Sequence, residues 1–316
     1  RKADCGPGVH LDGTGWNETK NAIFVSATSE TSSTDPQLQP PSCLLNRNHV
    51  AGLTETAKTK ENGGRNARFS SGQEPPPKQR DKRHRRRHKP HKIHRTLISS
   101  MRNSKEFGVQ MDREAKRRKF GNAPRRAFVG DGSSCNWKIR DAHFSDYVPI
   151  LDFIHAVTYL HRGSIACFGK GDPAWENYKR WMMLTWQGSV ATVIDELLVH
   201  QSRLGEAPAD APEDDPREQL RQIIGYLKNN RERMHYARYR CDGLPTTSAW
   251  MESAVKEINY RTKGTEMFWN NPTGAEAILQ IRAASLSDDD RLARFLAQRP
   301  GAARVRKANQ TAATAN

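Results

Sequence analysis

The sequence has no long apolar run, few cysteines and a small share of apolar residues. No stretch approaches the roughly 18–20 consecutive apolar residues of a membrane span, so no membrane segment is expected. The N-terminal residues lack the apolar segment of a secretory signal peptide. Hydrophobic residues make up only 35% of the 316 positions, which predicts that part of the chain is solvated rather than packed.

The cysteines exclude two further classes of protein. There are five, they lie far apart, and none forms a C-x-x-C pair. Neither a zinc ribbon nor a disulfide framework is therefore indicated. An odd, scattered set suits reduced thiols and hence a cytoplasmic location.

Positive charge is abundant and concentrated. The 51 Lys and Arg residues exceed the 35 Asp and Glu residues, giving a net charge of +16, and without an obvious basic amphipathic helix this favours nucleic acid over membrane as the partner. Residues 78–95 contain ten Lys and Arg and one Asp, a net charge of +9. With three consecutive prolines before it, this run predicts a disordered basic linker over residues 54–92. The linker is either a solvated loop or a phosphate-binding segment whose contacts include Arg83, Arg85, Arg86 and Arg87.

Short apolar runs alternate with helical patterns. Strands are expected at residues 21–28, 95–101, 126–132 and 147–152. Helices are expected at residues 104–119, 153–160, 174–187, 190–204, 216–239, 246–262 and 274–284. The aromatic residues at 175–186 have nearly helical spacing, so they are interpreted as helix core rather than as a cofactor site. The order predicts an α/β fold with a helical second half.

Three acidic residues are candidates for metal-dependent chemistry. Asp131 and Asp152 each end an apolar strand, and His155 follows Asp152 by three residues. Glu252 lies near the start of a helix, with Lys256 on the same face. Carboxylates that converge from strands and a helix suit Mg²⁺. Two such ions can activate a nucleophile and stabilise the leaving oxygen in phosphoryl transfer.

Each of these residues also has a purely structural explanation. Asp-Gly is a common turn dipeptide, so Asp131 could be a turn residue. Asp152 could cap the helix that starts at Phe153. Glu252 could be a surface residue paired with Lys256.

The motifs around these acids resemble a known family. They are AFVGDG at 127–132 with Asn136 and Trp137, ILDFIH at 150–155 with Tyr159 and Leu160, and GLP at 243–245 with Ser248, MES at 251–253, Lys256, Asn259, Arg261 and Lys263. In combination they resemble DDE transposases of the Kra-type bacterial insertion sequences, relatives of the Mutator-like group. The resemblance covers roughly residues 1–50 and 93–286, and the 54–92 insert does not belong to it.

The resemblance implies a ribonuclease-H-like fold and assigns roles to the acids. Asp131 matches the second acid and Glu252 the final one, and both would bind metal. Asp152 and His155 match a D-x-x-H signature that supports the site. The other assignment, with Asp131 and Asp152 as first and second acids, leaves only 21 residues for two strands and a helix. The first catalytic Asp is expected on a strand before residue 21, in a segment that precedes Arg1.

The predicted organisation follows from this resemblance. It is a ribonuclease-H-like α/β core with an all-α insertion and a disordered basic linker. The core comprises residues 1–53 and 93–155 and the helices at 245–286. The linker is at 54–92, the helical insertion at 156–244 and a disordered tail at 287–316. The implied function is metal-dependent DNA cleavage and strand transfer, with two Mg²⁺ or Mn²⁺ ions. Phosphate contacts would come from Lys256, Arg261 and Lys263.

The implied partner is double-stranded DNA, both element ends and target, bound by a homo-oligomer of a nucleoid-associated cytoplasmic protein. Two alternatives stay open. One is a truncated transposase remnant that binds DNA without catalysis. The other is a ribonuclease-H-like nuclease or resolvase that does not transfer strands.

Overall fold

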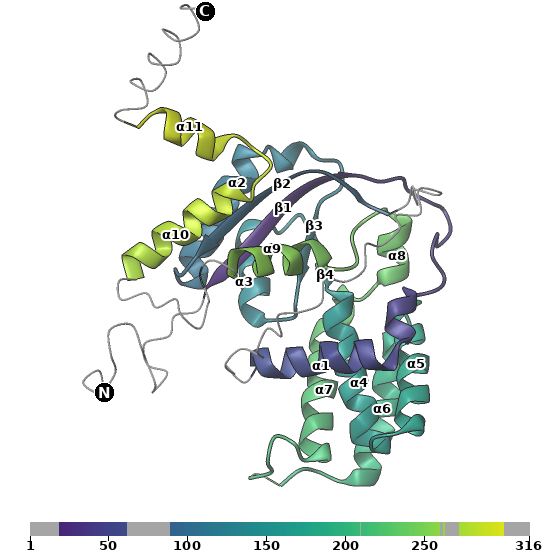
Figure 1. Ribbon diagram of the computed structural model, residues 1–316. Coiled ribbons are helices and arrows are strands. Elements are labelled where there is room, and N and C mark those ends of the chain that lie inside the picture. Colours follow the sequence, from purple (N-terminus) through teal and green to yellow (C-terminus); the bar gives the residue numbers. More distant parts are fainter. Residues whose placement is uncertain (1–18, 62–88, 209, 260–261, 263–271, 300–316) are drawn as a thin grey trace, which may run out of the picture. The chain divides into compact units, whose positions relative to one another are not determined.

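The chain is a mixed α/β protein composed of two units (Figure 1). The computed structural model describes residues 19–61, 89–208, 210–259, 262 and 272–299. The first unit comprises Arg1–Thr28, His91–Ala123 and Ala249–Asn316, and the second comprises Ser29–Pro90 and Pro124–Ser248. Within the described ranges, no helix combines the length and the apolar character of a membrane span.

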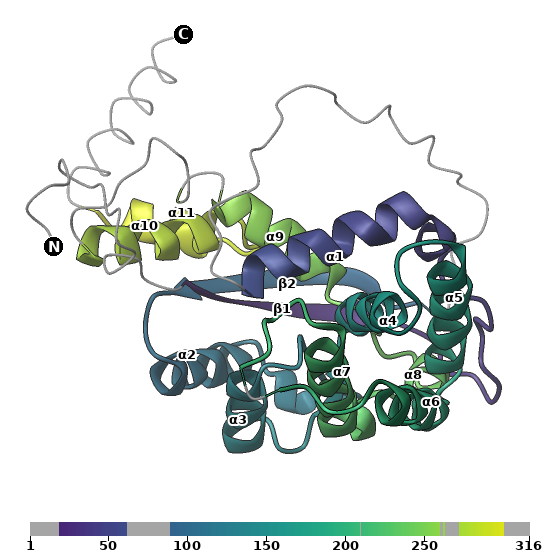
Figure 2. The same cartoon turned by 90° about the horizontal axis from the view of Figure 1, so that it is seen from below.

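An antiparallel strand pair organises the first unit. β1 (Lys20–Thr28) pairs with β2 (His91–Ser100), and the register runs from Lys20↔Ser100 to Thr28↔His91. Figure 2 shows α9 (Ala249–Asn259) and α10 (Pro272–Ser285) on one face of this pair and α2 (Ser104–Arg117) on the other. Leu97 of β2 is buried against a small cluster formed by Ala254, Ile258, Leu279 and Ala283.

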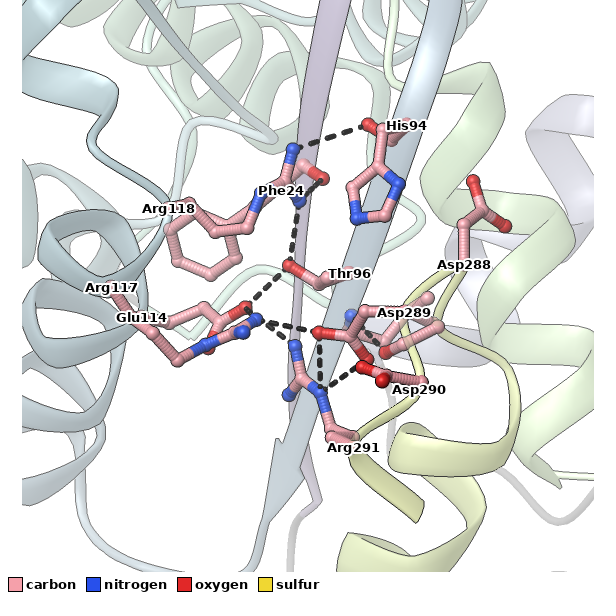
Figure 3. Close-up of polar contacts among 12 residues, drawn as sticks. Phe24, His94, Thr96, Glu114, Arg117, Arg118, Asp288, Asp289, Asp290 and Arg291 are labelled. Atoms are coloured by element: carbon pink, nitrogen blue, oxygen red, sulfur yellow. Dashed lines mark hydrogen bonds and ion pairs between the residues drawn. The ribbon is translucent and has the colours of Figure 1, made fainter. Parts of the chain in front are cut away.

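A polar network ties the end of the first unit to α2 and β2 (Figure 3). Glu114 is buried and accepts hydrogen bonds from the Thr96 hydroxyl, from Arg117 (2.7 and 2.9 Å) and from Arg291 (2.7 Å). Arg117 also donates to Asp289 at 2.8 Å. These contacts explain why the segment after α10 continues into α11 (Arg291–Ala297), where the sequence predicted the start of a disordered tail over 287–316. Residues 300–316 of that predicted tail lie outside the described residues.

Acid should weaken this network. Burial alone would raise the pKa of Asp289, but its hydrogen bonds to Arg291 and Arg117 and their charges outweigh burial and lower the pKa to about 2. The unfolded chain therefore takes up a proton at a higher pH than the folded chain, so the stabilisation is complete above pH 5 and is lost as the pH falls towards 2. The free energy of unfolding, measured with urea, should fall between pH 6 and pH 3 in both proteins. The fall should be about 1–2 kcal/mol smaller in Asp289→Asn than in the parent. Equal losses in the two proteins would contradict this account.

A parallel strand pair and a helical block form the second unit. β3 (Ala127–Gly130) pairs with β4 (Val148–Leu151), from Ala127↔Val148 to Gly130↔Leu151. α3 (Ser134–His143) connects the two strands, as a parallel pairing requires. The remaining helices are α1 (Arg47–Glu61), α4 (Phe153–Phe168), α5 (Asp172–Trp186), α6 (Val190–Leu204), α7 (Pro216–Asn230) and α8 (Tyr236–Cys241), with 3₁₀ turns at Ser42–Leu45 and Arg231–Arg233.

The core of the second unit surrounds α4. Phe153, Val157 and Leu160 of α4 are fully buried, and α1, α5 and α7 pack against this helix. Tyr178, Trp181 and Trp186 of α5 are also buried, which confirms the interpretation of these aromatic residues as helix core. All four predicted strands are present at nearly the predicted positions.

The observed helices differ from the predicted ones at three places besides α11 and the longer α4. The predicted helix over 216–239 ends at Asn230, because the Asn230 side chain bonds Trp137 Nε1 (3.0 Å) and the Tyr226 carbonyl (2.9 Å) as the backbone turns towards α8. α1 and α3 were not predicted at all. α1 extends into the segment predicted as linker because Thr54 is buried and its hydroxyl bonds His161 of α4 at 2.9 Å. Residues 62–88 of that linker lie outside the described residues.

Candidate active site

Two strand-end aspartates lie at the same edge of the second unit's sheet. Asp131 directly follows β3 and Asp152 directly follows β4, and the last residues of these strands, Gly130 and Leu151, are register partners. The Asp152 amide donates to the Gly130 carbonyl at 2.8 Å, which extends the pairing by one residue. Carboxyl ends of parallel strands are common ligand sites in α/β proteins. This edge is therefore the candidate active site of the unit.

Asp131 has an oriented and accessible carboxylate. Its Oδ1 accepts hydrogen bonds from the Ser133 amide at 2.9 Å and from Asn136 Nδ2 at 2.8 Å. Oδ2 receives no hydrogen bond from the described part of the chain, and the residue is exposed. Asp131 is thus a turn residue, as its structural explanation required, and it also presents one oxygen that fits a divalent cation.

Asp152 has the opposite character. The residue is 1% exposed, and its Oδ1 caps α4 by accepting the Ile154 amide at 3.0 Å. Its Oδ2 lies 3.0 Å from His155 Nδ1 and accepts the Ser248 hydroxyl. The capping interpretation is confirmed. With protein donors on both oxygens, Asp152 fits a supporting position better than a metal ligand.

Gly132 allows the turn after Asp131 to form. Its φ of 95° is one that residues with a side chain rarely adopt, and a Cβ there would lie 2.5 Å from Tyr226 Cε2. Gly132→Ala is therefore expected to lower the free energy of unfolding by about 1–3 kcal/mol. Urea denaturation measures the loss. Gly225→Ala is the matched control, because nothing lies within 4 Å of a Cβ at that helical position and its backbone is unstrained. A loss no larger than the control's would contradict the steric account.

Glu252 and Lys256 lie in the first unit. Both belong to α9, where Glu252 is half-buried and Lys256 is exposed, while Ala254 and Ile258 face the core. No ion pair joins Glu252 to Lys256 among the described residues, so the structural explanation of Glu252 by such a pair is wrong. Because Asp131 belongs to the other unit, its convergence with Glu252 stays a prediction.

The remaining candidates lie outside the described residues. They are Arg261, Lys263, Arg83, Arg85, Arg86 and Arg87. Among the residues that the structure does describe, no three His, Cys, Asp or Glu side chains gather as a metal-binding group. A site with two metal ligands, Asp131 and Glu252, stays a prediction.

Two residues near the aspartates had no assigned role in the sequence. Tyr226 lies in the predicted helix over 216–239, and its contact with Asp131 joins residues 95 apart. Ser248 appeared only as a motif residue, and its bond to Asp152 joins residues 96 apart. No local sequence signal indicates either contact.

Comparisons of the chain with models of protein families, with curated proteins and with solved structures found no match. The resemblance to DDE transposases therefore stays a prediction.

Proposed function

We propose that this chain is an insertion-sequence transposase that cuts and joins DNA with divalent metal ions held by Asp131 and Glu252. The observation that carries the proposal is the exposed, oriented carboxylate of Asp131 at the carboxyl end of β3, beside the buried Asp152 at the end of β4. The antiparallel β1–β2 pair followed by α2 and the parallel β3–β4 pair supports a ribonuclease-H-like core.

Chain connectivity supports a shared site for Asp131 and Glu252. The Ser248 hydroxyl is bonded to Asp152, and the Thr246 carbonyl accepts the Phe153 amide at 3.0 Å. Glu252 follows Ser248 by only four residues, a span of at most about 14 Å even for an extended chain. Asp152 and Phe153 thus hold residues 246–248, which precede Glu252 in the chain, next to the end of β4.

The proposed reaction has two phosphoryl-transfer steps. In the first, a water oxygen bonds to a DNA phosphorus and the P–O3′ bond breaks. The leaving O3′ takes up a proton from the water, which gives one strand end with a 3′-hydroxyl and one with a 5′-phosphate. In the second, the oxygen of that 3′-hydroxyl bonds to a phosphorus of the target DNA, the target's P–O3′ bond breaks, and the proton passes to the leaving O3′, which becomes a new 3′-hydroxyl. Bound Mg²⁺ or Mn²⁺ would lower the barrier by activating the nucleophile and neutralising the leaving oxygen.

The other residues would bind or position DNA. Lys256, Arg261 and Lys263 follow Glu252 closely and would contact phosphates near the scissile bond. Arg83, Arg85, Arg86 and Arg87 would add sequence-independent affinity by releasing counterions. Asp152 and His155 would support the site without binding the metal ions. Double-stranded DNA, at element ends and target, and a homo-oligomer in the nucleoid are the partners and setting that this role requires.

A second candidate is a transposase remnant that binds DNA without cutting it. The charge of +9 over residues 78–95 favours DNA binding whether or not metal is bound.

A paired binding and nicking assay separates the two candidates. The chain, extended by the strand that is expected to carry the first catalytic Asp, is incubated with a supercoiled plasmid bearing element-end DNA in Mg²⁺ or EDTA, and complex formation is followed by gel shift. A transposase is expected to bind in both buffers and to leave nicks with 3′-hydroxyl ends only in Mg²⁺. Binding without nicks in either buffer would favour the remnant, and nicks that persist in EDTA would exclude the metal-dependent mechanism.

A further inference from the structure

Tyr226 of α7 reaches the turn that carries Asp131. Its hydroxyl donates a hydrogen bond of 2.8 Å to the main-chain carbonyl of Asp131. The ring lies against Gly132, where even a methyl group would overlap its Cε2, Oη and Cζ atoms. One side chain from the helical block therefore contacts two consecutive residues of the turn.

The Tyr226 ring is itself held in place. It stacks on Tyr159 of α4 with ring centroids 3.6 Å apart and an interplanar angle of 3°. The Arg162 guanidinium lies 5.3 Å from the Tyr159 ring centroid, one helical turn further along α4. Stacked rings of this kind resist rotation, and a cation over an aromatic face adds to the attraction. The hydroxyl of Tyr226 thus has a fixed position.

We propose that Tyr226 is a positioning residue that fixes the direction of the Asp131 carboxylate. The carbonyl of Asp131 and its Cβ are bonded to the same Cα, so holding the carbonyl limits rotation of the residue. The Ser133 and Asn136 bonds to Oδ1 then set the carboxylate plane, and Oδ2 points in one direction. The expected consequence, that Asp131 binds a divalent cation more tightly with Tyr226 than without it, rests on the proposed function. The positioning contact itself does not.

Tyr226→Phe tests the proposal because it removes the hydroxyl and keeps the stacked ring. The parent chain and its variants are compared by Mn²⁺ titration, with free ion followed by electron paramagnetic resonance. Amide hydrogen exchange of the 131–136 turn is measured in parallel. Tyr178→Phe is the matched control, because the Tyr178 hydroxyl also donates to a main-chain carbonyl, that of Leu44 at 3.1 Å, elsewhere in the same unit. Asp131→Asn reports whether Asp131 binds the ion at all.

We expect Tyr226→Phe to weaken Mn²⁺ binding about two- to tenfold, the range that one lost hydrogen bond allows. Exchange in the turn should accelerate by a similar factor, and Tyr178→Phe should change neither quantity. Unchanged exchange in Tyr226→Phe would overturn the proposal. Weaker Mn²⁺ binding in Asp131→Asn but not in Tyr226→Phe would also overturn it and leave the proposed function intact. Parental Mn²⁺ binding in Asp131→Asn with faster exchange in Tyr226→Phe would reject the proposed function and retain the positioning contact.

Discussion

Asp131→Asn and Glu252→Gln are each expected to lower the rate of Mg²⁺-dependent DNA nicking by about 10²–10³-fold, the usual effect of losing one electrostatic contact to the transition state. Both substitutions keep the size of the side chain and remove a negative charge that would hold the ions. DNA binding should change little, because the basic residues proposed to contact phosphates are retained. Plasmid nicking rates at saturating protein measure the first effect, and gel shifts measure the second.

Each substitution has a matched control nearby in the chain, in α3 for Asp131 and in α9 for Glu252. Asp141→Asn changes an exposed carboxylate of α3 that pairs with Arg140 at 3.0 Å. Glu257→Gln changes a carboxylate of α9 that lies 3.8 Å from Arg95. Both pairs are partly solvated, so little change is expected in stability or nicking. Parental nicking in either Asp131→Asn or Glu252→Gln would remove that residue from the metal site.

Asp152→Ala is expected to lower the free energy of unfolding by about 3 kcal/mol. The substitution removes the cap of α4, which contributes about 1 kcal/mol. It also leaves the His155 ring and the Ser248 hydroxyl without their acceptor in a partly buried place, at roughly 1 kcal/mol or more for each. Urea denaturation followed by circular dichroism measures the change in the free energy of unfolding.

Asp215→Ala is the control for the capping part of that loss. Asp215 caps α7 by accepting the Arg217 amide at 2.8 Å, and its carboxylate also pairs with the neighbouring Arg217 side chain at 2.7 Å. Asp215→Ala should therefore cost clearly less stability than Asp152→Ala, since it removes only a cap. Similar losses for Asp152→Ala and Asp215→Ala would mean that the bonds to His155 and Ser248 contribute little, and Asp152 would then be only a cap.

Local patterns predicted most of the elements but few of the contacts between them. Short apolar or β-branched runs are sufficient to place β1 to β4, because such residues fit the buried positions of a strand. The end of α7 was missed because it depends on a hydrogen bond between Asn230 and Trp137, which are 93 residues apart. α11 was missed because its short, charged sequence resembles a solvated tail until Arg291 meets the buried Glu114.

The candidate site was likewise predictable in its residues but not in their contacts. Asp131 and Asp152 were found from their positions after apolar strands, and their common edge follows from parallel pairing. Their different environments were not predictable, because the burial of Asp152 depends on Ser248 and the orientation of Asp131 depends partly on Tyr226. Periodicity identifies which residues face a core, but it does not identify which distant polar groups meet.

Iron-mediated cleavage of the polypeptide tests most directly whether Asp131 and Glu252 share their ions. Fe²⁺ replaces Mg²⁺ in the full chain, peroxide generates radicals at the bound iron, and mass spectrometry maps the breaks. The account predicts breaks next to both 131 and 252 at the same iron concentration, and their joint loss with excess Mg²⁺. Breaks near only one of the two positions, or breaks that Mg²⁺ leaves unchanged, would contradict it.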